Sequence, residues 1–269
     1  MAFQGVPGSF SSMAARALFG SDTSAIHTQQ FRDIFERVMD GSANFGVVPI
    51  ENAVAGSVHE NYDLLEEYSC SVVAETQIPV QLHLMAISHE GYLSKVYSHP
   101  KALEQCSAFF AKHPEIEATV WSDTAGAAQH VAKLKDPSLA AIASEEAATI
   151  HGLRVLKHSI QNHPNNSTRF VAIAREPHGE TNPTKCSLVI SLAHKPGSLF
   201  AILKEIAELG LNLTKIESRP ILGAPFSYSF HIDIECLSDR STALQEATRR
   251  ISLHAEQLKI LGFYCTVRS

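Results

Sequence analysis

The segment from Asn166 to Phe170 places an amide, two hydroxyls and a guanidinium side by side, at the start of an apolar run that continues to Ala174. A guanidinium is a planar fork of N–H donors that suits a carboxylate. A neighbouring hydroxyl can donate a hydrogen bond to a reacting oxygen as that oxygen gains negative charge. The segment therefore predicts an anion site that includes a proton donor, although a turn before a strand would have the same composition.

Short β-rich runs alternate with helical patterns in the first two thirds of the chain. The runs, each followed by a polar turn, cover residues 45–50, 72–77, 96–97, 119–121 and 139–143. Apolar residues three and four positions apart predict helices over residues 12–19, 31–39, 102–112 and 124–134. This alternation favours a largely parallel sheet with helices on its faces.

Ligands of such α/β folds collect beyond the carboxyl ends of the strands, where helix N-termini expose N–H groups. Polar turns deliver hydroxyl, amide or acid groups to this edge at residues 51–57, 98–100, 122–124 and 144. A cleft is therefore predicted there, although Ser122, Asp123 and Ser144 also suit helix N-caps. The glycine-rich turn 5–11 enters a helix and is a weaker candidate anion nest, without a dinucleotide or P-loop pattern.

A domain boundary is predicted at residues 175–183, which combine two prolines, a glycine and polar residues. Beyond it, strands are expected at 186–192, 211–218, 226–234 and 258–267, and helices at 199–209 and 242–256. The order βαββαβ is ferredoxin-like. Phe226, Tyr228 and Phe230 alternate with smaller or polar residues, and we expect them, like Trp121, in the core.

The composition argues against several classes of protein. Of 269 residues, 45% are hydrophobic, and no segment approaches the roughly 18 consecutive apolar residues of a membrane span. A formal net charge of −6, without a lysine- or arginine-rich run, argues against a nucleic-acid surface. No secretory signal is visible, so we expect a cytoplasmic protein with a small ligand.

The cysteines and histidines show no metal-binding spacing. The five cysteines are odd in number, far apart and without a C-x-x-C pair, which predicts reduced thiols. The 14 histidines form no H-E-x-x-H pattern, although His99 and His163 lie near the polar motifs. No metal is therefore expected.

Seven short motifs in order resemble prephenate dehydratase with a C-terminal ACT domain, over nearly the whole chain. Each is weak alone, whereas seven in register are a strong signal. The first five are Gly5-x-x-Gly8-Ser9-Phe10-Ser11, Pro49-Ile50-Glu51-Asn52 with Gly56-Ser57-Val58, Ser98-His99-Pro100, Ser122-Asp123-Thr124-Ala125 and Thr168-Arg169-Phe170. The last two are Pro196-Gly197-Ser198-Leu199 and Glu217-Ser218-Arg219-Pro220.

The resemblance implies a fold like that of type II periplasmic binding proteins, with two α/β lobes around a cleft, followed by an ACT domain. The catalytic domain would cover residues 1–177, with one lobe from roughly 1–77 and 159–177 and the other from 78–158. A linker at 178–184 and an ACT domain at 185–269 would follow. With no chorismate mutase segment ahead of it, we expect a monofunctional protein.

The resemblance also implies the reaction. Prephenate loses carbon dioxide and its ring hydroxyl together, giving phenylpyruvate for phenylalanine synthesis without a cofactor. The protein must then anchor a dicarboxylate and stabilise a departing hydroxide. Carried onto this sequence, Thr168 donates to the leaving hydroxyl, directly or through water, and Arg169 or its neighbourhood holds a carboxylate.

Further site residues follow from the same resemblance. Catalytic or supporting positions are Glu51, Asn52, Ser98 and Gln105, and substrate contacts are expected at Ser9, Ser11, Asn166, Phe170, Ser122 and Thr124. Because a carboxylate would repel a dianion, Glu51 is either protonated or a partner that orients Asn52 or Arg169. The family's serine after the Glu-Asn pair is Ala53 here, which removes a hydroxyl.

The ACT resemblance implies regulation by L-phenylalanine. The effector would contact Pro196, Gly197, Ser198, Leu199, Glu217, Ser218, Arg219 and Pro220. Gly197 lets the backbone approach a ligand, while Ser198 replaces the family's alanine. An uncovered sheet invites pairing with a second chain, so we expect a homodimer or homotetramer in which phenylalanine favours a less active arrangement.

Two alternatives stay open. Arogenate dehydratase acts on a substrate whose keto group is replaced by an amine, and the sequence does not exclude it. A non-catalytic sensor of an aromatic ligand would need the arginine but no positioned donor, so Thr168-Arg169-Phe170 argues against that class.

Overall fold

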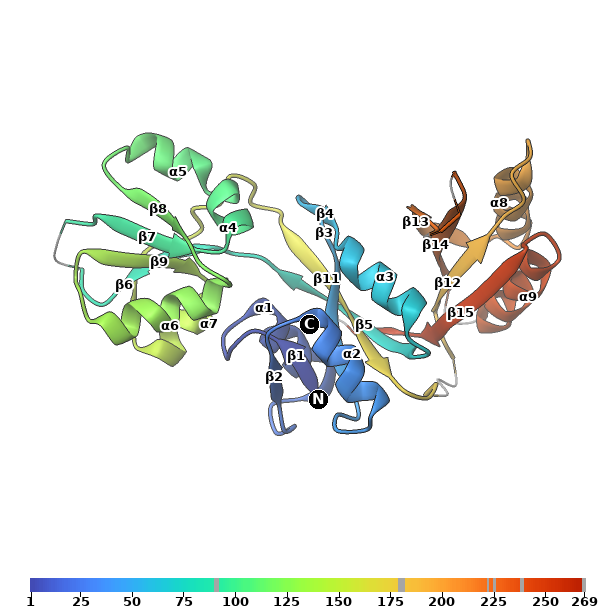
Figure 1. Cartoon of the computed structure of the whole chain (residues 1–269), viewed down its shortest axis with the longest axis horizontal. Helices are drawn as coiled ribbons and strands as arrows, with labels where there is room; N and C mark the ends of the chain where they lie inside the picture. The colour runs from blue at the N-terminus through green and yellow to red at the C-terminus, as the bar shows by residue number, and fades with distance from the viewer. Residues whose placement is uncertain (90–91, 179–181, 222, 225, 238–239, 268–269) are drawn as a thin grey trace.

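Three sheets lie in a row along the long axis of the molecule, with the sheet of the first lobe in the middle (Figure 1). This computed structural model describes residues 1–89, 92–178, 182–221, 223–224, 226–237 and 240–267. Residues 179–181 of the expected linker therefore lie outside the described residues. Among the described residues, no helix is both long and apolar enough to cross a membrane.

The middle sheet has the strand order β16-β5-β11-β3-β1-β2, with β4 paired to β3. Its strands are β1 (Ala2–Gln4), β2 (Ile26–Thr28), β3 (Gly46–Asn52), β4 (Gly56–Ser57), β5 (Ser71–Pro79), β11 (Ser167–Ala174) and β16 (Thr266–Val267). Its helices are α1 (Phe10–Phe19), α2 (Phe31–Met39) and α3 (His59–Glu67). Consecutive residues of β11 point to opposite faces of the sheet and pack in different cores: Phe170 lies in the cluster with Ala14 of α1, and Val171 in the cluster with Phe35 of α2.

The second lobe has the strand order β10-β6-β9-β7-β8. Its strands are β6 (His83–Ala86), β7 (Lys95–Ser98), β8 (Glu117–Val120), β9 (Leu139–Ala143) and β10 (Arg154–Lys157). Its helices are α4 (Pro100–Gln105), α5 (Ser107–Lys112), α6 (Thr124–Leu134) and α7 (Glu145–His151). The single helix predicted over 102–112 is thus wrong, because the backbone leaves helical geometry at Cys106 (φ −109°, ψ 19°).

Both sheets are mixed, so the prediction of largely parallel sheets is also wrong. The chain passes from the first lobe to the second after β5 and returns before β11, and these two neighbouring strands run antiparallel. β11 is also antiparallel to β3, and β6 is antiparallel to both β9 and β10. The return of the chain from the second lobe therefore accounts for the antiparallel direction of β11 in the middle sheet.

The third sheet has the order β13-β14-β12-β15, and the predicted βαββαβ order is confirmed. Its elements are β12 (Lys185–Ser191), α8 (Ser198–Glu208), β13 (Asn212–Pro220), β14 (Tyr228–Glu235), α9 (Ser241–Ser252) and β15 (Gln257–Tyr264). The strand expected over 258–267 is two strands, because β16 leaves this sheet and pairs with β5. The expected aromatic core is wrong in part: Phe230 packs against the core, but Phe226 precedes β14 and is 84% exposed, and Tyr228 is 43% exposed.

One face of the third sheet packs on its own helices, and the opposite face docks against the first lobe. Val189, Leu261 and Tyr264 belong to the same buried cluster as Leu65 and Val72 of that lobe. A Cβ on Gly262 would lie 2.0 Å from the carbonyl oxygen of Val72, so the two backbones are in direct contact. The prediction that this face is uncovered and available to a second chain is therefore wrong.

His231 lies in this interface with only 2% of its surface exposed, edge-on to Tyr62 of α3. Burial lowers the pKa of His231 below the ordinary 6.5. The negative charges of Glu66 and Asp233 raise it, but by less than burial lowers it. The unfolded chain then takes up a proton at a higher pH than the folded protein. The free energy of unfolding should therefore fall as the pH decreases through about 6.5.

We expect His231→Phe, which keeps a ring against Tyr62, to show a smaller loss of unfolding free energy between about pH 7.5 and about pH 5.5 than the wild type. Urea unfolding at the two pH values measures this difference. His194→Phe makes the same change at an exposed position and should keep the wild-type pH dependence. Equal pH dependence in all three proteins would contradict the assignment.

Candidate active site

The side chains of Asn52 and Thr168 meet at the end of two paired strands. Asn52 donates from Nδ2 to Oγ1 of Thr168 at 2.9 Å and to the carbonyl of Ser167 at 3.2 Å. The amide orientation is fixed because Asn52 Oδ1 accepts from the N–H groups of Val54 and Ala55. Since Oγ1 of Thr168 is an acceptor in this bond, its own proton is free to be donated elsewhere.

A β-bulge at Ile50 decides which way the neighbouring side chains point. Arg169 is opposite Glu51, whereas Phe170 is opposite Pro49, so Ile50 is an extra residue without a partner on β11. The extra residue switches the face on which the following residues of β3 project. Glu51 and Arg169 therefore share the face of the third domain, and the next pair, Asn52 and Thr168, shares the other.

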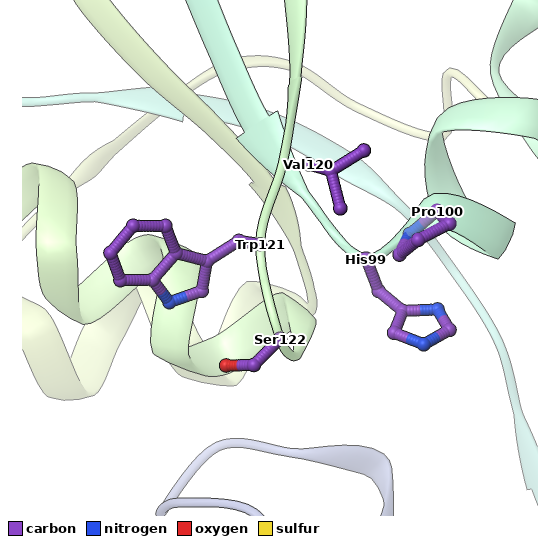
Figure 2. A pocket seen from close by; sticks show the side chains of 5 residues that line it. All are labelled: His99, Pro100, Val120, Trp121 and Ser122. Carbon is purple, nitrogen blue, oxygen red and sulfur yellow. The ribbon is translucent and has the colours of Figure 1, made fainter.

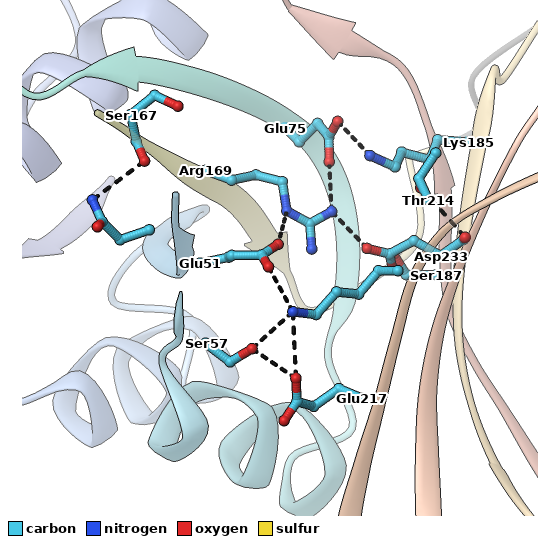
Figure 3. A network of polar contacts seen from close by, with 12 residues as sticks. Glu51, Ser57, Glu75, Ser167, Arg169, Lys185, Ser187, Thr214, Glu217 and Asp233 are labelled. Atoms are coloured by element: carbon cyan, nitrogen blue, oxygen red, sulfur yellow. Dashed lines mark hydrogen bonds and ion pairs between the residues drawn. The ribbon is translucent and has the colours of Figure 1, made fainter. Parts of the chain in front are cut away.

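Arg169 contacts carboxylates of the protein itself, and this corrects its expected role. Its Nη1 lies 2.6 Å from Asp233 and 3.3 Å from Glu75, and only 10% of its side chain is exposed (Figure 3). Burial alone would lower the pKa of Arg169, but the charge of Asp233 and its other neighbours raise it overall. The guanidinium is thus fully charged and engaged away from Thr168, so it does not anchor a substrate in this arrangement.

Glu51 is also part of this domain interface. Its carboxylate lies 2.7 Å from Nζ of Lys215 and 3.9 Å from Nε of Arg169 (Figure 3). Lys215 also donates to Ser57 at 2.7 Å. The sequence predicts Glu51 either as a protonated acid or as a partner that orients Asn52 or Arg169. The geometry supports the second role, toward Arg169, on the sheet face opposite to Thr168.

Asn166 and Gln105 connect the start of β11 to the second lobe. Asn166 donates from Nδ2 to Oε1 of Gln105 at 3.2 Å, and it is 4% exposed. Its own Oδ1 is buried without a protein partner among the described residues. Both side chains thus lie where the chain crosses between the lobes, and their roles at the site remain predictions.

Two expected site residues are structural instead. Ser98 is fully buried, and its hydroxyl donates to the carbonyl of Ile142 at 2.6 Å, which ties β7 to β9. Phe170 is 2% exposed in the core under α1. Neither side chain is available to a ligand, and both roles as substrate or catalytic contacts are corrected.

The turn before α1 reaches across to the second lobe. Ser9 caps α1 by accepting from the N–H of Ser12 and is 7% exposed, while Ser11 is half-buried in the first helical turn. The carbonyl of Gly8 accepts from Ser144, and a Cβ on Gly8 would lie 2.8 Å from Cα of Ala147. A glycine is required there because φ is +88° and the lobes touch.

An open pocket of about 500 Å³ lies at the carboxyl ends of β7 and β8 (Figure 2). It is lined by His99, Pro100, Val120, Trp121 and Ser122. Trp121 is half-buried: it packs against the core under α6, as expected, and it also lines this pocket. Its ring stacks on that of His130, with the ring centroids 4.0 Å apart. Ser122 is exposed, and Thr124 is the first residue of α6, whose N-cap is Asp123.

His99 is the pocket residue with a defined proton position. Its Nδ1 accepts from the N–H of Lys101 at 3.2 Å, and burial lowers its pKa below the ordinary value. The neutral ring then carries its proton on Nε2, where it can donate to an anion in the pocket. His99 was singled out from the sequence only by its position in a motif.

The two segments expected to bind phenylalanine lie at the same end of the third sheet. Ser191, at the end of β12 before the first segment, and Arg219, in the second segment, are both paired with Ser229 of β14. Gly197 has φ +86° at the N-cap of α8, and no atom lies within 4 Å of a built Cβ. Ser198 donates to the carbonyl of Ala193 at 2.7 Å. Pro196 is exposed and Leu199 half-buried.

The second segment divides between two faces. Ser218 and Pro220 are exposed, whereas Glu217 and Arg219 turn towards the first lobe. Glu217 accepts from Ser57 at 2.8 Å, and Arg219 forms a two-pronged ion pair with Asp63 of α3. For these two residues, the expected role as ligand contacts is corrected to one in the domain interface.

Sequence reasoning missed the partners on the third domain, above all Lys215 and Asp233. The signal was present, because charged and polar residues alternate along β13 at Lys215, Glu217 and Arg219. Ser229, His231 and Asp233 do so along β14, and these three are at most 6% exposed. A polar strand face that is buried indicates a polar partner.

One group of side chains has the composition of a metal site. His83, Glu145 and His158 each offer a ligand atom, all within 4.8 Å of one another. However, Nδ1 of His83 accepts from the N–H of Ser159 at 3.2 Å, which places the proton of the neutral ring on Nε2. His83 therefore has no free lone pair for a metal in this arrangement.

Known proteins are similar to this chain over nearly its whole length. Residues 1–178 match the Prephenate dehydratase family and residues 187–251 match the ACT domain. The bifunctional chorismate mutase/prephenate dehydratase of Escherichia coli (strain K12) is 35% identical, over 98% of this chain and 70% of that protein. The chloroplastic arogenate dehydratase/prephenate dehydratase 2 of Arabidopsis thaliana is 38% identical, over 98% and 72%.

The fold is also similar to that of a solved prephenate dehydratase structure. The prephenate dehydratase of Arthrobacter aurescens, described in complex with L-Phe, has a TM-score of 0.85 to this chain at 28% identity. The match covers 98% of this chain and 89% of that one.

The buried Ser98 hydroxyl supplies a test that separates a structural role from a catalytic one. We expect Ser98→Ala to lower the free energy of unfolding by about 1 kcal/mol, because one buried hydrogen bond is lost, while kcat stays at the wild-type value. Chemical unfolding and steady-state kinetics measure the two quantities. A large loss of kcat at unchanged stability would restore the catalytic role.

Proposed function

This chain belongs to the prephenate dehydratase family, and we propose that it converts prephenate to phenylpyruvate, carbon dioxide and water. The observation that carries the proposal is the Asn52–Thr168 pair, in which the Thr168 hydroxyl accepts from Asn52 and its own proton is free to be donated. The reaction needs one positioned donor and sites for two carboxylates. No cofactor is part of the proposal.

The chemistry requires a proton at one place. The ring carboxylate leaves as carbon dioxide, its electron pair enters the ring, and the ring carbon releases its hydroxyl with the bonding electrons. The departing oxygen takes up one proton and leaves as water, and the ring becomes aromatic. Thr168 stabilises the developing charge on this oxygen by a hydrogen bond, directly or through a water molecule.

We infer that neutral donors hold the carboxylates, because Arg169 is engaged with Asp233 and Glu75. The donors available are the first turn of α1 with Ser9 and Ser11, the Asn166–Gln105 bridge, and the pocket edge at His99, Ser122 and Thr124. Helix N-termini and hydroxyls bind carboxylates in this way.

We infer that L-phenylalanine regulates the enzyme through the ACT domain. The relative from Arthrobacter aurescens described in complex with L-Phe supports this proposal. Contacts to the effector would come from the exposed side of the two segments, at Pro196 to Leu199 and at Ser218 and Pro220. The edge strand β13 is the surface we propose for pairing in a homodimer or homotetramer, and a cytoplasmic location remains a prediction.

Arogenate is the second candidate substrate, because the Arabidopsis thaliana relative bears both names. Arogenate differs from prephenate by an amine in place of the keto group. The ring chemistry is the same, so Thr168 would have the same role in either case.

The decisive experiment incubates the purified chain with prephenate or arogenate and follows the aromatic product. We expect rapid turnover of prephenate that L-phenylalanine suppresses. Turnover of arogenate alone would move the assignment to the second substrate. Activity on neither would contradict the proposed function and favour a sensor.

Removal of the Thr168 hydroxyl tests the donor. We expect Thr168→Ala to reduce kcat by about 10²- to 10⁴-fold with the fold intact, whereas Thr168→Ser keeps a hydroxyl and loses much less. Thr149→Ala, which removes a hydroxyl from the surface of α7, is the matched control. The donor role is wrong if Thr168→Ala turns over like this control.

A further inference from the structure

Two pairs of oppositely charged residues, each pair formed by directly paired strand positions, face each other across the domain interface. On the first lobe, Glu51 of β3 is opposite Arg169 of β11. On the third domain, Lys215 of β13 is opposite Asp233 of β14. The charges are complementary, since Glu51 lies 2.7 Å from Lys215 and Arg169 lies 2.6 Å from Asp233. We refer to these four residues as the ionic clamp.

Further residues form hydrogen bonds and ion pairs around the ionic clamp (Figure 3). Asp233 also accepts from Ser187, and Glu75 accepts from Lys185 at 2.8 Å and from Thr266 at 2.7 Å. The side chains of Arg169, Asp233 and Lys215 are at most 12% exposed. Charges this deeply buried are stable only when they are paired, so the network strongly favours one docked position.

The clamp lies directly beside the candidate proton donor. Glu51 and Arg169 are the strand neighbours of Asn52 and Thr168, and the two pairs are consecutive rungs of the same two strands. Neighbouring residues of a strand are about 3.3 Å apart along its axis, so movement of one rung moves the next. A displacement of about 1 Å in a reacting group can cost roughly 10²-fold in rate.

We propose that Lys215 and Asp233 of the ACT domain are positioning residues for the reaction, which hold the Asn52–Thr168 pair in place through Glu51 and Arg169. The proposal rests on the proposed function. It assigns part of the catalytic geometry to a domain whose residues do not touch the substrate.

The same arrangement gives a route for regulation. β13 carries Lys215 on its inner face and Ser218 and Pro220 on its exposed face. A ligand that shifts this strand from its exposed face therefore moves Lys215 with it. Because Lys215 contacts Glu51, Ser57 and Glu217, the shift reaches the end of β3 and the strand β4 beside it.

Lys215→Met tests the proposal, with Asp63→Asn as the matched control. Asp63 forms another ion pair between β13 and the first lobe, with Arg219, but it makes none of the clamp contacts. We expect Lys215→Met to lower kcat by roughly 10-fold or more with little change in KM, and Lys215→Arg to recover most of it. Asp63→Asn should keep the wild-type kcat.

A second readout is independent of any substrate. The backbone N–H of Ala53 donates to the carbonyl of Ser167 at 2.9 Å, beside the Asn52–Thr168 pair. We expect hydrogen exchange of this amide to be roughly 10-fold faster in Lys215→Met than in the wild type, and unchanged in Asp63→Asn. Asp233→Asn, which leaves Arg169 paired with Glu75, serves the same purpose if Lys215→Met does not fold.

The outcomes separate the two proposals. If the wild type turns over neither substrate, the proposed function fails, and the exchange of Ala53 still decides whether the clamp positions this rung. If Lys215→Met and Asp63→Asn show the same kcat and the same exchange, the clamp is only structural and the inference is overturned. Equal losses in both variants, in step with lower unfolding midpoints, would overturn it as well.

Discussion

The bulge at Ile50 is the local feature on which the arrangement of the site depends. In a regular pair of strands, side chains alternate strictly between the two faces of the sheet. The single extra residue in β3 changes this alternation, so that Asn52 meets Thr168 on one face while Glu51 meets Arg169 on the other. A polar donor pair and a pair of opposite charges can therefore occupy consecutive rungs without competing for one another. Had Glu51 faced Thr168, its carboxylate would repel a dianionic substrate and accept the proton that Thr168 is proposed to donate.

The interface between the catalytic and ACT domains combines two kinds of contact with different energetic character. Its apolar part, with Val189, Leu261 and Tyr264 in a core shared with the first lobe, favours association of the domains by burying apolar surface. Its charged part contributes less to net stability, because desolvation of the charges offsets their attraction. What the charged part provides is selectivity for one position, since a sliding movement would leave Arg169 or Asp233 buried without a partner. Stability and alignment are thus supplied by different residues of the same surface.

Much of the fold could be predicted from the sequence, because its signals are local. The periodicity of residues 31–39 and 124–134 matches α2 and α6 at both ends, and the βαββαβ order of the third domain follows from alternating helix and strand patterns. The Asn52–Thr168 contact could not be predicted from local pattern alone, because it depends on the register of two strands more than 110 positions apart in the chain. The roles of Ser98, Phe170, Glu217 and Arg169 failed for the same reason. Residue type and motif position indicate what a side chain can do, whereas the strand register decides which face it occupies.

The short strand β16 changes how the ACT domain is connected to the rest of the protein. Thr266 and Val267 pair with β5, so the chain leaves the middle sheet after β11 and re-enters it at β16. In topological terms the ACT domain is inserted into the catalytic sheet between two of its strands, and is not simply appended to it. A chain cut after β11 would lose a strand of the catalytic sheet and expose the backbone of β5 as a free edge, which favours aggregation. Recombination that exchanges one ACT domain for another would, on the same grounds, have to preserve this returning strand.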